Sequence, residues 1–235
     1  MELKEIERVS NISPQEFKEN YLDPRKPVII TDLAEDWEAT GKWTFDYLRD
    51  NFGHLEVPLY AKDYHNSGSG YMSSKKSMKF GDYLTLIENE PTDYRMFLYN
   101  IFEHAPELSD DFELPDIMDG FMEKYQFMFF GGEGSFVNLH YDIDCSCVFH
   151  THFQTTKECV LFPPDQSKLL YNHPFTVQSH VDLLNPDYKK FPALKQAKGY
   201  RTILKHGETL FMPPLYWHFM HYIEGGYSLS LRANV

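Results

Sequence analysis

Short apolar runs separated by turn residues fill the second half of this 235-residue chain, and they constrain its fold more than any other feature. Glycine and proline clusters punctuate the runs, as at 131–134 and 163–165. Runs of this length that are rich in β-branched and aromatic residues are typical of β-strands. Many such strands in succession predict a sandwich or a barrel. The expected strands lie at 126–130, 135–140, 148–153, 158–162, 201–204, 209–212 and 227–231.

The first part of the chain mixes helical and extended patterns. Ser13-Pro14-Gln15-Glu16 predicts a helix start, with Ser13 as N-cap and Glu16 completing a capping box. Because no linker-like segment separates the halves, we expect one domain over residues 1–235, with a mixed α/β part (1–120) packed on a β-barrel core (121–235). Other patterns predict strands over 27–31, 55–60 and 94–99, helices from 44 and over 78–87, and a loop with a short helix over 182–199.

The charge balance and the cysteine content restrict the setting in which the chain works. Its formal net charge is −13, whereas nucleic-acid binders usually carry a basic stripe that displaces counterions from phosphates. The composition therefore disfavours nucleic acid and favours a protein, a peptide or a small molecule as partner. Three cysteines, an odd count, argue against a disulfide framework and fit a reducing compartment. No apolar run reaches membrane-spanning length and no signal-peptide core begins the chain, so we expect a cytoplasmic protein.

His140-Tyr141-Asp142, followed 78 positions later by His218, predicts a metal site. On a strand, residues i and i+2 point to the same face, so His140 and Asp142 would project side by side. His218 follows a strand-like run and a proline turn that would aim its imidazole inward, and His221 is the alternative third ligand. Two histidines and one carboxylate with an open face are typical of non-haem Fe(II) oxygenases, although Zn²⁺ accepts the same ligands.

Lys157 bears on the choice of metal. A lysine near a strand end usually lies on the surface, and an inward lysine in an apolar interior is costly unless an anion pairs with it. A dicarboxylate co-substrate would supply that anion, and its other end, a 2-oxo acid, can chelate iron through carboxylate and ketone oxygens. Lys157 therefore favours iron together with a 2-oxo acid.

Around these residues the chain resembles the JmjC, or cupin-like, group of Fe(II)- and 2-oxoglutarate-dependent oxygenases. Within that group it most resembles the branch that contains the hypoxia-factor asparaginyl hydroxylase and the wybutosine-tRNA hydroxylase, and we expect a bacterial member. The resemblance covers roughly residues 10–233. It rests on five segments, at 43–48, 131–142, 157–164, 185–192 and 207–218.

The resemblance implies a mainly β fold with flanking helices, the double-stranded β-helix or jelly roll. It implies His140, Asp142 and His218 as the ligands of Fe(II), with His218 preferred to His221 because it falls five residues after the first proline of the turn, as in the family. It also implies that Lys157 grips the distal carboxylate of 2-oxoglutarate. The enzyme would use O₂ to hydroxylate a C–H bond and release succinate and CO₂. An aspartate among the ligands favours a hydroxylase, because histone demethylases of the group more often carry glutamate there.

The chain departs from the branch at the co-substrate site. Val137 and Phe97 stand where the asparaginyl hydroxylase carries a threonine and a tyrosine, so two hydroxyl partners of the co-substrate are missing. The residues that we expect to replace them are Tyr99, Asn138, Thr151 and Arg232. An arginine can make a bidentate contact with a carboxylate, and a structural ion pair is the alternative role for Arg232.

Two other functions stay open on the sequence alone. Another metal-dependent cupin enzyme, such as an isomerase or a direct dioxygenase, would use the same three ligands without 2-oxoglutarate. An inactive JmjC-like module would keep the fold and bind a partner without turnover. Relatives often continue past the point where this sequence ends, with helices that form a dimer, so both an oligomer and a C-terminal extension stay open.

Overall fold

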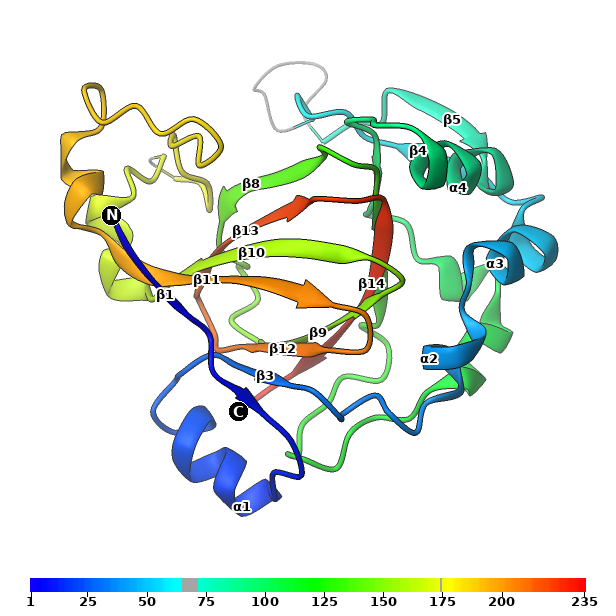
Figure 1. Cartoon of the computed structure of the whole chain (residues 1–235), viewed down its shortest axis with the longest axis horizontal. Coiled ribbons are helices and arrows are strands. Elements are labelled where there is room, and N and C mark those ends of the chain that lie inside the picture. The colour runs from blue at the N-terminus through cyan, green and yellow to red at the C-terminus, as the bar shows by residue number, and fades with distance from the viewer. Residues whose placement is uncertain (65–71, 174) are drawn as a thin grey trace.

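Most strands of the chain form two sheets that face each other, in a computed structural model that describes residues 1–64, 72–173 and 175–235 (Figure 1). The first sheet has the order β1-β11-β10-β13-β8, and the second has the order β2-β3-β12-β9-β14-β7-β6. Strands β7 to β14 make the predicted jelly roll. No strand pairing joins the two sheets within the described ranges, so the core is a pair of facing sheets and not the closed barrel that we expected.

Seven of the eight strands β7 to β14 correspond to the apolar runs of the sequence, which confirms the mainly β fold; β13 was not expected. The first sheet consists of β1 (Glu2–Glu5), β11 (Lys198–Lys205), β10 (Thr156–Phe162), β13 (Trp217–Tyr222) and β8 (Phe136–His140). The second consists of β2 (Arg8–Val9), β3 (Val28–Ile30), β12 (Thr209–Met212), β9 (Cys147–Phe153), β14 (Gly226–Ala233), β7 (Phe127–Gly131) and β6 (Arg95–Met96). A separate antiparallel pair is formed by β4 (Glu56–Leu59) and β5 (Lys76–Lys79).

Side chains along β9 point alternately to the core outside the second sheet and to the space between the two sheets. Phe149 and Phe153 belong to the large core on the outer face of the second sheet, where Phe153 lies 5.2 Å from Trp43, measured between ring centroids. Val148 and His150 point to the opposite face, into the space between the sheets. All residues of β9 are buried, including the polar residues His150, Thr151 and His152, so the strand is covered on both faces.

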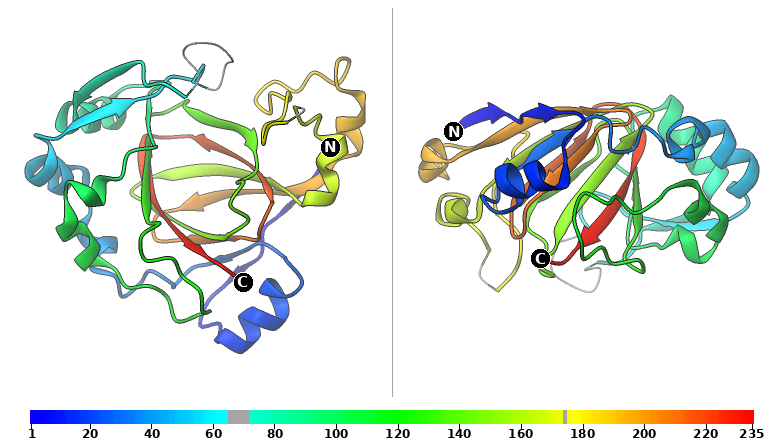
Figure 2. Two further views of the ribbon diagram at one scale, coloured as in Figure 1. Left: turned by 180° about the vertical axis from the view of Figure 1, so that it is seen from behind. Right: turned by 90° about the horizontal axis from the view of Figure 1, so that it is seen from below.

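Helices cover the outer face of the second sheet, and Figure 2 shows α2 to α4 gathered on one side of the two sheets. Ser13 caps the first helix with the predicted capping box, and the Thr44 hydroxyl caps the third by accepting from the backbone N–H of Tyr47 at 3.0 Å. No described helix is long and apolar enough to span a membrane. The helices are α1 (Pro14–Phe17), α2 (Glu38–Lys42), α3 (Phe45–Phe52) and α4 (Phe80–Asn89), with a π-turn η1 (Lys18–Leu22) and 3₁₀ turns η2 (Ile101–Glu103), η3 (Pro106–Asp111), η4 (Pro164–Leu169) and η5 (Pro192–Gln196).

Strand pairing changes several boundaries expected from local patterns. The helix expected over 78–87 begins only at Phe80, because Met78 pairs with Val57 across β4 and β5. The strand expected over 94–99 shortens to β6. Strands β1, β2, β3 and β6 come from the first 120 residues yet extend the two sheets, so the sheets draw on both parts of the chain.

Candidate metal centre

The three predicted metal ligands meet at one end of the space between the sheets. His140 ends β8 and pairs with His218 on β13, and Asp142 lies two residues beyond the strand. The Nε2 atoms of His140 and His218 lie 3.8 and 3.9 Å from Oδ1 of Asp142. One donor atom from each residue lies within 4.8 Å of the other two, so all three can bind one ion. Across the described parts of the chain, no other group of His, Cys, Asp and Glu is arranged in this way.

An irregularity in the pairing of β8 and β13 sets the two histidines opposite each other. The register shifts between His218, which pairs with His140, and Met220, which pairs with Val137. The two imidazole rings lie 4.2 Å apart, measured between centroids. We expected a proline turn to aim His218 inward; instead His218 lies within a strand, and strand alternation orients its ring.

Backbone carbonyls fix the tautomers of both histidines. Nδ1 of His140 donates to the carbonyl oxygen of Asn138 at 2.8 Å, and Nδ1 of His218 donates to that of Tyr216 at 3.1 Å. A carbonyl oxygen only accepts, so each Nδ1 must carry the proton. The lone pairs of both Nε2 atoms are therefore free to bind a metal ion.

The surroundings also keep His140 and Asp142 in the protonation states that metal binding requires. Burial, followed by the neighbouring His218, lowers the pKa of His140 to about 3. Burial acts to raise the pKa of Asp142, but His218, His140 and Arg232 together outweigh it and hold that pKa at about 2. At neutral pH the imidazole is neutral and the carboxylate is charged, as metal ligands must be.

Arg232 joins the site through the carboxylate ligand. Its Nη2 donates to Oδ2 of Asp142 at 3.0 Å, while its Nη1 donates to Asp144 at 2.8 Å and to Ser146 at 3.1 Å. These bonds leave Oδ1 of Asp142 facing the histidines. Arg232 lines the cavity, but the contacts fit the ion-pair role that was the alternative to co-substrate binding.

His221 lies outside the site. Its Nδ1 lies 3.2 Å from Oε2 of Glu158, and the other carboxylate oxygen, Oε1, forms an ion pair with Arg201 at 2.5 Å. His221 and His218 are three residues apart on β13, and strand alternation sends their side chains to opposite faces. Of the two candidates for the third ligand, the geometry favours His218.

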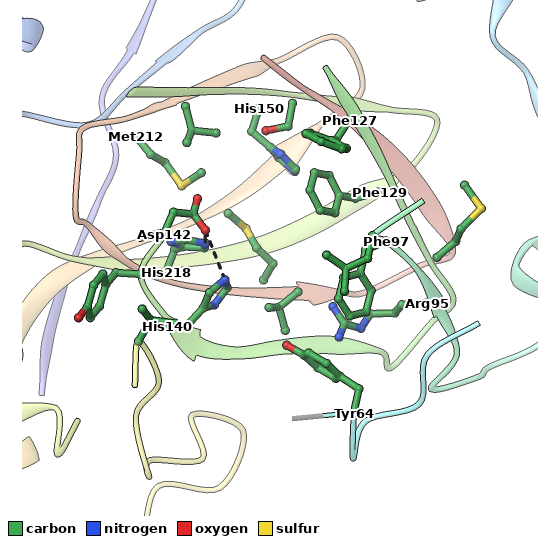
Figure 3. Close-up of a pocket in the computed structure, with 18 of the residues that line it drawn as sticks. Tyr64, Arg95, Phe97, Phe127, Phe129, His140, Asp142, His150, Met212 and His218 are labelled. Carbon is green, nitrogen blue, oxygen red and sulfur yellow. Dashed lines mark ion pairs between the residues drawn. The ribbon is translucent and has the colours of Figure 1, made fainter. Parts of the chain in front are cut away.

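The ligands open into a cavity of about 420 Å³ between the sheets (Figure 3). Lys157 lies in its wall with only 1% of its surface exposed. Its Nζ donates to the Ser228 hydroxyl at 2.8 Å, lies 3.0 Å from Nε2 of His150 and sits 4.2 Å from the centroid of the Tyr222 ring. Burial lowers the pKa of Lys157 to about 7. The rest of the wall is largely apolar and includes Phe97, Phe127, Phe129, Val137, Met212 and Met220.

Three of the expected co-substrate contacts do not line this cavity. Tyr99 stacks on His104 instead, with ring centroids 5.0 Å apart. Thr151 shares a hydrogen bond of 2.8 Å with Thr209, because alternation along β9 turns it away from the face that carries His150. Asn138 is likewise absent from the cavity wall, to which its neighbour Val137 contributes.

The structure adds a residue that sequence reasoning missed, Arg95. It lies in the two-residue strand β6 and lines the cavity with 3% of its surface exposed. The run around it was interpreted as an apolar strand, and the one available signal was a single charge inside that run.

Comparison with known proteins agrees with the fold. Residues 14–230 match the sequence profile of the cupin-like domain. Lysine-specific demethylase 8 of Danio rerio is 30% identical over 97% of this chain and 58% of its own length. JmjC domain-containing protein D of Dictyostelium discoideum is 29% identical over 96% of the chain and 56% of its own length. tRNA wybutosine-synthesizing protein 5 of Gallus gallus is 26% identical over 97% of the chain and 76% of its own length. The chain thus spans a little over half the length of the first two relatives.

Proposed function

The chain belongs to the cupin-like domain family, and on that basis we propose that it is an Fe(II)- and 2-oxoglutarate-dependent oxygenase that hydroxylates a C–H bond. One observation carries the proposal: a two-histidine, one-aspartate set opens into a cavity whose wall holds a buried lysine. The ligand set suits an O₂-activating iron, and the lysine suits a dicarboxylate.

The donor set fits Fe(II) through its chemistry. Two neutral imidazole nitrogens and one carboxylate oxygen converge from one side, and the opposite side opens to the cavity. His140, Asp142 and His218 would hold the ion, and Arg232 would keep the Asp142 carboxylate oriented. When bound, iron with 2-oxoglutarate supplies the oxidation of a C–H bond by O₂, with succinate and CO₂ as co-products.

Lys157 would bind the distal carboxylate of 2-oxoglutarate. Its ammonium is buried and Ser228 and His150 already orient it, so it would meet an incoming anion without rearrangement. A carboxylate beside it would offset the cost of burying the charge. Phe127 and Phe129 in the apolar wall would keep water away from the bound co-substrate.

The primary substrate is proposed to be a protein, a peptide or a small molecule. Curated relatives are named as lysine-specific demethylases and as a tRNA wybutosine-synthesizing protein, so both methyl removal and hydroxylation belong in the test. Hydroxylation of an N-methyl carbon gives an unstable product that releases formaldehyde. Hydroxylation of a carbon that is not attached to nitrogen leaves a stable product that is 16 Da heavier. Assaying formaldehyde and product mass together distinguishes the two outcomes. Cytoplasmic location remains part of the proposal, and the free thiols Cys145, Cys147 and Cys159 are compatible with it.

The decisive experiment combines binding with turnover. The protein is loaded anaerobically with Fe(II) and titrated with 2-oxoglutarate; labelled 2-oxoglutarate, ascorbate and O₂ are then supplied and succinate is measured. We expect binding and at least slow succinate formation, with both reduced in Asp142→Ala. A protein that binds the metal but neither binds nor consumes 2-oxoglutarate would refute the proposal and favour a cupin enzyme of other chemistry.

A further inference from the structure

Arg95 is a buried cation, and two of its side-chain nitrogens lack a polar partner among the described residues. Its Nε and Nη2 atoms are inaccessible and have no hydrogen-bond partner in the described parts of the chain. Asp142 is the only acidic residue among the described residues of the cavity wall, and Arg232 already holds it. A buried guanidinium without an anion is costly, so its place in the wall indicates that something negatively charged enters the cavity.

Two aromatic rings hold this guanidinium in place. Its central carbon lies 5.0 Å from the centroid of the Tyr64 ring and 4.7 Å from that of Phe97. The two rings also contact each other edge to face, with centroids 4.8 Å apart, so the guanidinium lies against both rings and not between them. The contacts are cation–π interactions, which orient a guanidinium but leave its N–H donors unused. Arg95 therefore keeps unused N–H donors in the cavity wall, and a guanidinium with free donors can bind a carboxylate in a bidentate way.

Arg95 and Lys157 lie at the same end of the cavity. Arg95 pairs across β6 and β7 with Gly131, and cross-strand neighbours lie about 5 Å apart. A Cβ atom on Gly131 would lie 2.5 Å from Cε2 of Tyr222, so the tyrosine ring packs directly on that glycine. The Lys157 ammonium sits 4.2 Å from the centroid of the same ring. The backbone of Arg95 thus lies beside the ring on which the Lys157 ammonium sits, and the charge of Arg95 is one of those that act on Lys157 and lower its pKa after burial.

We propose that Arg95 and Lys157 form a two-cation subsite for the distal carboxylate of 2-oxoglutarate. Arg95 supplies hydrogen-bond donors to this carboxylate in place of the hydroxyl groups expected at positions 97 and 137. Phe97 and Val137, which lack hydroxyl groups, line the same cavity. The carboxylate accepts from the guanidinium edge on one side and from the ammonium on the other. This inference rests on the proposed function and adds Arg95 to Lys157 as a second residue that determines co-substrate specificity.

The test compares two 2-oxo acids on metal-loaded protein without O₂. Isothermal titration gives affinities for 2-oxoglutarate and for 2-oxobutanoate, which lacks the distal carboxylate. Arg95→Gln should weaken 2-oxoglutarate binding by about 10- to 100-fold, the loss expected for a charge-assisted contact. It should leave 2-oxobutanoate binding within about twofold of wild type, because that ligand does not reach the subsite.

Matched variants separate this role from a structural one. Arg95→Lys keeps the positive charge but loses the paired N–H donors of the planar guanidinium, so it should weaken 2-oxoglutarate binding less than Arg95→Gln. Arg201→Gln removes an exposed arginine outside the cavity and should change neither affinity. The effects of Arg95→Gln and Lys157→Met should not add, because both cations hold one carboxylate. The melting temperature of each variant reports whether it is folded.

Three outcomes would overturn the inference. Unchanged 2-oxoglutarate affinity in folded Arg95→Gln would assign the guanidinium to an anionic group of the primary substrate. Equal weakening of both 2-oxo acids would show a general effect on the site. Absence of 2-oxoglutarate binding by the wild-type protein would refute the proposed function as well, whereas the first two results leave that function intact.

Discussion

Replacing Lys157 with methionine should stabilise the ligand-free fold while it weakens 2-oxoglutarate binding. Methionine keeps a long apolar stem but removes the buried ammonium, whose residue is 1% exposed. Burial lowers the pKa of Lys157 from 10.5 to about 7. That difference corresponds to roughly 5 kcal/mol of destabilisation, at about 1.36 kcal/mol per pKa unit. The ligand-free wild-type protein would thus be less stable than the variant, because it buries the Lys157 ammonium without the anion that this ammonium would bind.

Polar neighbours reduce the expected gain. Ser228 and His150 lose the Lys157 ammonium as a hydrogen-bond partner, which costs about 1–3 kcal/mol. The net increase in the free energy of unfolding should therefore be about 2–4 kcal/mol, or a melting temperature about 4–16 °C higher for a chain of this size. The measurement is thermal and urea unfolding of metal-free protein without 2-oxoglutarate.

The sign of the pH dependence sharpens this prediction. The folded pKa of Lys157 lies below its unfolded value, so the penalty is fully present below about pH 7 and fades as the pH rises towards 10.5. The stabilisation by Lys157→Met should be larger at about pH 6.5 than at about pH 9. Lys198→Met, at a lysine side chain that is 74% exposed, should change stability by less than about 0.5 kcal/mol. The reasoning fails if Lys157→Met is no more stable than wild type at about pH 6.5, or if its advantage does not depend on pH.

Three further predictions concern the site. His218→Ala should weaken metal binding at least about 100-fold, because each ligand contributes roughly 3 kcal/mol or more to the binding free energy. His221→Ala should leave the metal affinity within about twofold of wild type. A metal titration that shows the reverse would make His221 the third ligand in place of His218. Arg232→Gln should lower metal affinity by about 10- to 100-fold by freeing the Asp142 carboxylate, and unchanged affinity would deny Arg232 that orienting role. In metal-saturated protein, 2-oxoglutarate affinity should fall as the pH rises above about 7, where Lys157 loses its proton, and this fall should be absent in Lys157→Met when the two are titrated in parallel.

The sequence predicted the jelly roll because seven of the eight strands β7 to β14 carry local signals; β13 was missed because it follows directly on a proline turn. The runs from 126 to 231 are mostly buried and end at turn residues, so composition and punctuation reveal them without tertiary information. The capping box at Ser13 is likewise a local feature. The metal ligands were within reach because His140 and Asp142 share a short spacing and the family resemblance supplied His218.

Features that depend on distant partners were beyond local reasoning. Strand β1 is mostly exposed and has no apolar alternation, and it exists because it pairs in parallel with β11 near the other end of the chain. Thr151 was expected in the cavity, but a one-residue difference in strand register decides which face a side chain takes. Arg95 reaches the cavity through its pairing with Gly131, which no local pattern in the sequence encodes.

The pairing of His140 with His218 ties metal acquisition to the late stages of folding. The two residues are 78 positions apart, and contacts over such separations form slowly because the chain must first close a long loop. Until β13 docks on β8, no segment of the chain presents all three donors together, so we expect the ion to bind the finished fold and to slow its unfolding. Because backbone carbonyls already set both histidine tautomers and burial keeps His140 neutral, a chain that releases its ion should stay folded and be ready for reloading.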